Sequence, residues 1–167
     1  MGQESGDEGE AQSCAQYCTQ VDDHCEADLQ QYPGTVECEA VCSVFAAGNV
    51  DDTLGNNLAC RIYHAGNAAE DPAGHCRHAG PGGDGVCGGN CESFCSLAAE
   101  LCSGDQSQFA STEECISACN QFPTEPPFNS GVVSGDSFAC RLYHLEVAAL
   151  QPATHCPHIG LVSDVCQ

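Results

Sequence analysis

The sequence predicts a mainly helical, small, disulfide-rich protein made of two tandem three-helix repeats that are stapled by cysteines. Three observations predict this class: the sixteen cysteines fall into two matching sets of eight, many of them recur at helical spacing, and apolar residues are scarce. The first set is Cys14, Cys18, Cys25, Cys38, Cys42, Cys60, Cys76 and Cys87, and the second is Cys91, Cys95, Cys102, Cys115, Cys119, Cys140, Cys156 and Cys166.

The two sets share their spacing. In both, the first five cysteines follow C-x3-C-x6-C-x12-C-x3-C, and fifteen residues separate the sixth from the seventh. Such self-similarity is the signature of a repeat protein. We therefore expect a disordered acidic tail over residues 1–10, a first repeat over 11–87, a junction at 88–90 and a second repeat over 91–167.

The composition makes cross-links necessary. Only 29 of the 167 residues are Leu, Ile, Val or Phe, and the net charge is −21, values that are typical of disordered chains. A disulfide that closes a loop of tens of residues contributes on the order of 3–4 kcal/mol by restricting the unfolded chain. Because each repeat has an even number of cysteines, we expect complete pairing in an oxidising compartment, secreted or periplasmic. A cytosolic metal–thiolate protein is the alternative.

Charge and hydropathy exclude several partners. With no lysine and three arginines, the chain has no basic surface for nucleic acid or anionic lipid. No apolar run is long enough for membrane insertion or for an export signal, and Met1 is followed directly by polar residues. We expect that an export signal has been removed or replaced by a start codon.

Each repeat is expected to contain three helices. The first carries cysteines at helical spacing, over residues 10–25 and 91–102. The second begins near Thr35 and Ser111, and in the later copy Ser111 opens a capping box. The third carries Leu54 and the Cys60–His64 segment, or the twin segment 140–144, and ends before a proline. A short turn or single helical turn and a closing loop follow it.

The two helices that each carry C-x3-C resemble the helical hairpin of the coiled-coil-helix-coiled-coil-helix (CHCH) family, over residues 14–42 and 91–119. In that family two parallel disulfides staple a pair of antiparallel helices. The resemblance implies the pairs Cys14–Cys42, Cys18–Cys38, Cys91–Cys119 and Cys95–Cys115, and it transfers no activity. The pairing of the other eight cysteines stays open.

Six of the seven histidines occupy matched positions, which are His64, His75 and His78 in the first repeat and His144, His155 and His158 in the second. His75 and His78 are three residues apart, so on a helical turn both face the same way. Three neutral imidazoles with an open position suit Cu(II), which we favour, or Zn(II). Further ligands or supporting partners would be Tyr63 and Tyr143, and Arg61 and Arg141.

Two other sites fit the same residues. The H-C-x-H sequence around Cys76 and Cys156 also permits a cysteine-containing copper or zinc site. Such a site would disturb the even pairing unless Cys87 joined it in a site of two cysteines and two histidines. A non-covalent haem could lie between two histidines. We interpret the protein as a non-enzymatic, extracytoplasmic metal- or haem-binding protein for electron transfer, storage or delivery, with a redox partner or self-association. The alternative is a structural or adhesive extracellular module, for example a filament subunit, in which the histidines only pack.

Overall fold

The computed structural model describes residues 12–167 and confirms the predicted fold class: within that range the chain is helical, without strands, and is cross-linked by eight disulfides. The predicted tail over residues 1–10 lies outside the described residues. The helices of the first repeat are α1 (Cys14–His24), α2 (Thr35–Cys42), α3 (Leu58–Asn67) and α4 (Pro72–Ala79). Those of the second are α5 (Asn90–Leu101), α6 (Thr112–Cys119), α7 (Phe138–Ala148) and α8 (Pro152–His155).

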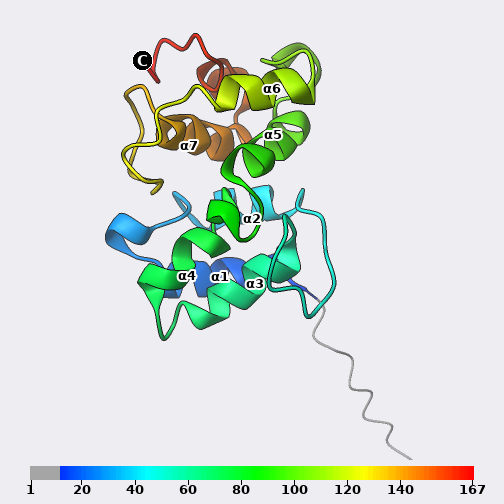
Figure 1. Cartoon of the computed structure of the whole chain (residues 1–167), viewed down its shortest axis with the longest axis vertical. Helices are drawn as coiled ribbons and strands as arrows, with labels where there is room; N and C mark the ends of the chain where they lie inside the picture. The colour runs from blue at the N-terminus through cyan, green and yellow to red at the C-terminus, as the bar shows by residue number, and fades with distance from the viewer. Residues whose placement is uncertain (1–11) are drawn as a thin grey trace, which may run out of the picture.

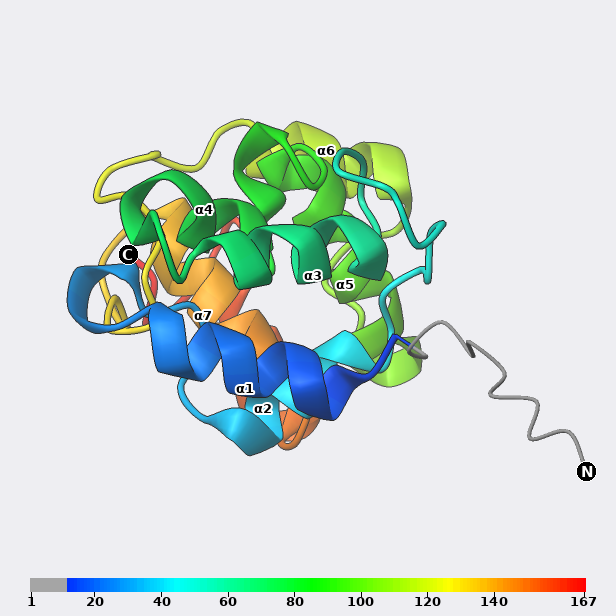
Figure 2. The same ribbon diagram turned by 90° about the horizontal axis from the view of Figure 1, so that it is seen from below.

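The two repeats are stacked along the long axis of the molecule (Figure 1). Within the first repeat, α1 packs against α2 and α3, and α3 runs beside α4, as Figure 2 shows from below. In the described part of the chain, no helix combines the length and apolar character that crossing a bilayer requires.

Side-chain caps explain where the helices begin. The Ser13 hydroxyl accepts from the Gln16 amide at the start of α1, and the side chains of Asn57 and Ser137 do the same for Cys60 and Cys140 at α3 and α7. Because Asn57 is this cap, Leu54 lies before the third helix and not in it, contrary to the prediction, and is 69% exposed.

A fourth helix is the other difference from the predicted architecture. The segment expected to be a short turn or a single helical turn forms the eight-residue α4, which starts at Pro72 behind an Asp71 cap. Proline at the first helical position is pre-organised for a helix and loses no hydrogen bond there. The matching segment of the second repeat is interrupted by Pro157, so that α8 ends at His155 and a 3-10 turn follows over Cys156–His158.

Eight disulfides, all within repeats, hold these helices together. The hairpin pairs are Cys14–Cys42, Cys18–Cys38, Cys91–Cys119 and Cys95–Cys115, the same pairs that the CHCH resemblance implies. The remaining pairs are Cys25–Cys76, Cys60–Cys87, Cys102–Cys156 and Cys140–Cys166. They tie the end of the first hairpin helix to α4 or its twin, and the third helix to the closing loop. No disulfide crosses the 88–90 junction.

The repeats meet through α7, which contacts α2. Leu142 is fully buried there, and the Ser130 amide donates to the Gln30 carbonyl across the interface at 2.9 Å. Glu146 is also fully buried, and neither of its carboxylate oxygens has a hydrogen-bond partner among the described residues. Burial, and secondarily the charge of Glu37, raises the pKa of Glu146 well above its ordinary value.

We predict that Glu146→Gln stabilises the protein at neutral pH. The raised pKa makes the native state bind a proton that the unfolded chain releases above pH 4.5, the ordinary value for this group. Stability from this group is therefore complete below pH 4.5 and is lost as the pH rises. The variant should gain on the order of 1–3 kcal/mol in unfolding free energy at pH 7 and almost nothing at pH 4.

Chemical denaturation under non-reducing conditions at the two pH values measures this difference. Glu70→Gln, at an exposed position, is the control and should change stability little at either pH. An equal gain for Glu146→Gln at both pH values would contradict the assignment.

Candidate metal centre

In the first repeat, three histidines meet between α3 and α4. His64 lies on α3, and His75 and His78 lie three residues apart on α4. The Nδ1 atoms of His64 and His75 are 2.8 Å apart, and the ring centroids of His64 and His78 are 4.9 Å apart. One ring nitrogen of each histidine lies within 4.8 Å of the other two. The matched histidines of this repeat thus form one cluster.

The second repeat forms the same cluster. Nδ1 of His144 on α7 lies 2.9 Å from Nδ1 of His155 and 3.1 Å from Nδ1 of His158. Its geometry persists although Pro157, which stands where the first repeat has Arg77, ends the helix. Two different local backbones therefore bring three imidazoles to the same point.

A backbone carbonyl orients the central histidine of each cluster. Nε2 of His64 lies 3.2 Å from the carbonyl oxygen of Thr53, and Nε2 of His144 lies 3.1 Å from that of Val133. A carbonyl oxygen only accepts, so Nε2 carries the proton and the Nδ1 lone pair faces the other two histidines. Such a hydrogen bond on the outer nitrogen is the usual support of a metal-binding histidine.

Hydrogen bonds within the described residues leave nitrogens of both clusters without partners. A single Nδ1 lone pair of His144 can accept from only one of its two neighbours. In the first repeat the Nδ1 atom of His78 is buried and has no hydrogen-bond partner. A cation at the centre could accept lone pairs from all three rings.

Burial favours the neutral form of four of these six imidazoles. It lowers the pKa of His64, His78, His144 and His155 below the ordinary value of 6.5. Neighbouring histidines lower the pKa further, and for His64 the Thr53 carbonyl opposes the shift. Neutral imidazole is the form that binds a metal ion.

The matched tyrosines pack against the clusters. The ring of Tyr63 lies edge-on to His64 with centroids 5.0 Å apart, and Tyr143 lies likewise against His144 at 5.1 Å. Tyr63 is 45% exposed. Within the described residues, neither hydroxyl makes a hydrogen bond to a histidine.

The matched arginines lie in the core. Arg61 is completely buried, its guanidinium stacks 4.1 Å above the ring of Phe45, and it donates to the carbonyls of Gly80 and Pro81. Arg141 repeats this arrangement: it stacks 4.2 Å above Phe122, donates to the Gly160 and Cys166 carbonyls and pairs with Asp136. Among the described residues neither guanidinium contacts a cluster histidine, so these arginines anchor the closing loop behind the site.

The cysteine-containing alternative is wrong. Cys76 is bonded to Cys25, Cys87 to Cys60 and Cys156 to Cys102, so none of the three offers a thiolate. The Cys60–Cys87 and Cys140–Cys166 disulfides do lie beside His64 and His144 and form part of the wall of each cluster. The unmatched His24 is separate, because its Nδ1 atom pairs with the Ala65 carbonyl at 3.0 Å.

Sequence reasoning missed two supports of the site. The Thr53 and Val133 carbonyls are backbone groups and carry no side-chain signal, although both stand eleven residues before the histidine that they orient. Phe45 and Phe122, on which the matched arginines stack, could have been found in the sequence, since each follows the last hairpin cysteine of its repeat by three residues.

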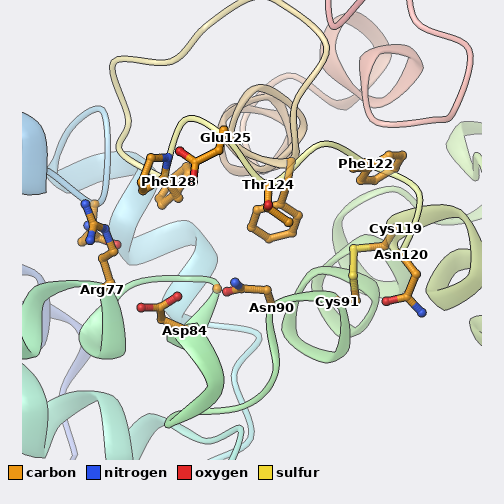
Figure 3. Close-up of a pocket in the computed structure, with 14 residues that line it drawn as sticks. Arg77, Asp84, Asn90, Cys91, Cys119, Asn120, Phe122, Thr124, Glu125 and Phe128 are labelled. Carbon is orange, nitrogen blue, oxygen red and sulfur yellow. A yellow bond between two sulfur atoms is a disulfide. The ribbon is translucent and has the colours of Figure 1, made fainter.

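A cavity between the repeats is distinct from both clusters. It measures about 400 Å³ and lies between the repeats, with Arg77 and Asp84 of the first facing Glu125 and Phe128 of the second (Figure 3). No histidine lines it.

Fold and site together define a class of protein: a helical repeat protein, stapled by disulfides, with a cluster of three histidines in each repeat. The sequence matches the model of the BfoA family C-terminal domain twice, over residues 4–91 and 88–166, and the chain therefore belongs to the BfoA family. No curated protein and no solved structure gave a significant match to the chain. The CHCH resemblance is thus limited to the hairpins.

We predict that Arg61→Lys and Arg141→Lys each lower the unfolding free energy by about 2–4 kcal/mol, because lysine keeps the charge but loses the planar fork and the stacking. Guanidinium denaturation with the disulfides intact measures the loss. Arg77→Lys is the matched control and should cost clearly less, since Arg77 lacks this set of carbonyl bonds. Equal losses for all three variants would refute the anchoring role.

Proposed function

We propose that this protein is an extracytoplasmic carrier that binds one transition-metal ion in each repeat, through His64, His75 and His78 and through His144, His155 and His158. The observation that carries the proposal is the convergence of Nδ1 atoms, 2.8 Å apart for His64 and His75 and 2.9 and 3.1 Å apart in the second cluster. Eight disulfides and no free cysteine favour an oxidising, extracytoplasmic location.

The spacing suits a single ion. Two nitrogens bound about 2.0 Å from one ion lie about 2.8 Å apart at adjacent square-planar positions and about 3.3 Å apart in a tetrahedron, and the observed separations fall in this range. The two axial nitrogens of a haem lie roughly 4 Å apart on opposite faces of the macrocycle. Rings whose nitrogens approach to 2.8 Å leave no space for a porphyrin between them, so we favour an ion over haem.

The donor set favours copper, with zinc as the second choice. Three neutral imidazoles suit both ions, and Cu(II) binds such donors more tightly. Blue-copper electron-transfer centres use a cysteine thiolate, whereas every cysteine here is in a disulfide. We therefore favour storage or delivery over electron transfer. His75 and His78 are only half-buried, which leaves a fourth position accessible for exchange.

The metal-free protein should bind two equivalents of Cu(II). His64→Ala and His144→Ala should each remove one equivalent, and the double variant should bind neither, because the orienting imidazole of each cluster is gone. Titration followed by calorimetry and elemental analysis counts the sites, and electron paramagnetic resonance of the Cu(II) form should show coupling to imidazole nitrogens.

His24→Ala is the control for general histidine binding and should keep two equivalents, because its ring pairs with a backbone carbonyl. The proposal would be contradicted if the wild-type protein bound no stoichiometric metal and the double variant gave a lower yield of folded protein. That result would favour the structural or adhesive module in which the histidines pack.

Binding should weaken as the pH falls, with a midpoint below the 6.5 of an ordinary imidazole. Protons compete with the metal for the ring nitrogens, and the lowered pKa of His64 and His144 means that this competition starts at a lower pH than for exposed histidine. Competition titrations with a chromogenic chelator from about pH 7 to pH 5 measure the affinity. A pH-independent affinity would exclude histidine ligands.

A further inference from the structure

Equivalent residues of the two repeats differ in burial on one face. In the first repeat Gln31, Tyr32, Pro81 and Gly82 are buried, and we call the face that they form the socket face. The matching residues of the second repeat are Gln108, Phe109, Leu161 and Val162. Gln108 and Phe109 are only half-buried, Leu161 is 49% exposed and Val162 is 91% exposed. The second repeat thus presents an uncovered socket face.

The opposite difference occurs on the third helix. In the second repeat Leu142 and Glu146 on α7 are fully buried, and we call this the ridge face. Their equivalents on α3 are Ile62, which is half-buried, and Gly66, which is exposed. A Cβ atom added to Gly66 would meet nothing within 4 Å. The first repeat thus presents an uncovered ridge face.

Within the chain these two faces bind each other. Leu142 lies over Gly82, since a Cβ atom on that glycine would sit 3.4 Å from Leu142 Cδ2. The α7 helix contacts α2, and the Ser130 amide donates to the Gln30 carbonyl beside Gln31. The repeat–repeat interface is therefore heterologous: the ridge face of one repeat meets the socket face of the other.

The free socket face of the second repeat contains a groove. It has a volume of about 330 Å³, and its lining includes Phe109, Leu161 and Val162 with Glu114 and Gln121 of the α6 side. Nothing in the described chain fills it. Its apolar floor has the position that α7 covers in the first repeat.

We propose that a second copy of this chain docks end to end, with the ridge face of its first repeat on the socket face of the second repeat of its neighbour. A heterologous contact whose two faces lie at opposite ends of a molecule continues indefinitely unless the rotation closes a ring. The chain would then assemble into linear polymers in which the repeat–repeat contact recurs at every step.

The charged residues at the contact support a second copy of the chain as the partner. Inside the chain Glu146 is completely buried, and burial, with a smaller contribution from the charge of Glu37, raises its pKa. At the contact between copies Gly66 stands in place of Glu146, opposite Glu114 in place of Glu37. The intermolecular contact therefore lacks the buried carboxyl group of Glu146, while Leu161 and Val162 replace Pro81 and Gly82 with larger apolar side chains.

Long-range charge opposes association. Each copy has a net charge of −21, so two copies repel at low ionic strength. Salt screens this repulsion beyond about 8 Å at 0.15 M, whereas apolar contacts persist. Assembly should therefore strengthen as salt is added, the reverse of an interface made by ion pairs.

Sedimentation velocity and equilibrium on the full oxidised chain, up to about 1 mM and at several salt concentrations, tests the proposal. Wild-type protein should form a concentration-dependent series of dimers and longer oligomers. Val162→Asp places a charge on the socket face. Gly66→Glu places on the ridge face the carboxyl group that Glu146 carries at the contact within the chain, here opposite Glu114, and so weakens the contact. Each should weaken association about tenfold or more, and both positions are exposed, so the fold should survive.

The decisive sample is the equimolar mixture of the two variants. Each retains the face that the other has lost, so the mixture should form dimers and nothing longer. Val36→Glu is the matched control: Val36 is 64% exposed, Glu113 occupies the equivalent position, and assembly should be unchanged. A wild-type protein that stays monomeric at every concentration and salt would overturn the proposal. So would variants that still assemble, or a mixture that remains monomeric.

Discussion

The disulfide framework is the constraint on which the rest of this structure depends. With few large apolar side chains and a high negative charge, the chain could not offset the conformational entropy of folding by burial alone. Among the described residues the largest completely buried side chain is an arginine, and much of the core consists of cysteine and alanine. Cross-links lower the entropy of the unfolded chain instead, and so permit a core that contains buried polar groups such as Arg61 and Gln31.

The same framework holds the histidine clusters. Cys25–Cys76 fastens α4 to the end of α1, and Cys60–Cys87 fastens α3 to the closing loop, so both helices that carry the first cluster are fixed at positions next to the histidines. Arg61 adds a non-covalent tie from α3 to the carbonyls of that loop. A site whose ligands are held in place by rigid elements loses little entropy when it binds a metal ion, and its geometry is set before the ion arrives.

Much of this arrangement can be predicted from side-chain pattern. Duplication shows in the cysteine spacing, and the matched histidines are conspicuous because His24 has no counterpart. The prediction failed for features that the backbone geometry determines, such as the first residue of a helix. The Asn57 side chain caps α3, so the helix begins after Leu54. Pro72 is the first residue of α4, but the sequence around a proline that begins a helix resembles the sequence around a proline that follows one. The Thr53 and Val133 carbonyls that set the histidine tautomer have no side-chain signature. The role of Arg61 is also predicted incompletely. Its place in the sequence suggests a supporting partner of the metal ligands, whereas its guanidinium stacks on Phe45 and donates to backbone carbonyls of the closing loop.

Because no disulfide spans the segment between Cys87 and Cys91, a stretched molecule should separate into its two repeats before either repeat unfolds. A pulling force applied at its two ends passes through covalent loops inside each repeat but only through side-chain packing and a few hydrogen bonds between them. The contact around Leu142 and Glu146 would break first, and the short junction would then extend. Each histidine cluster would stay intact, because four disulfides hold the repeat that contains it. Tension would thus lengthen the molecule without opening either cluster.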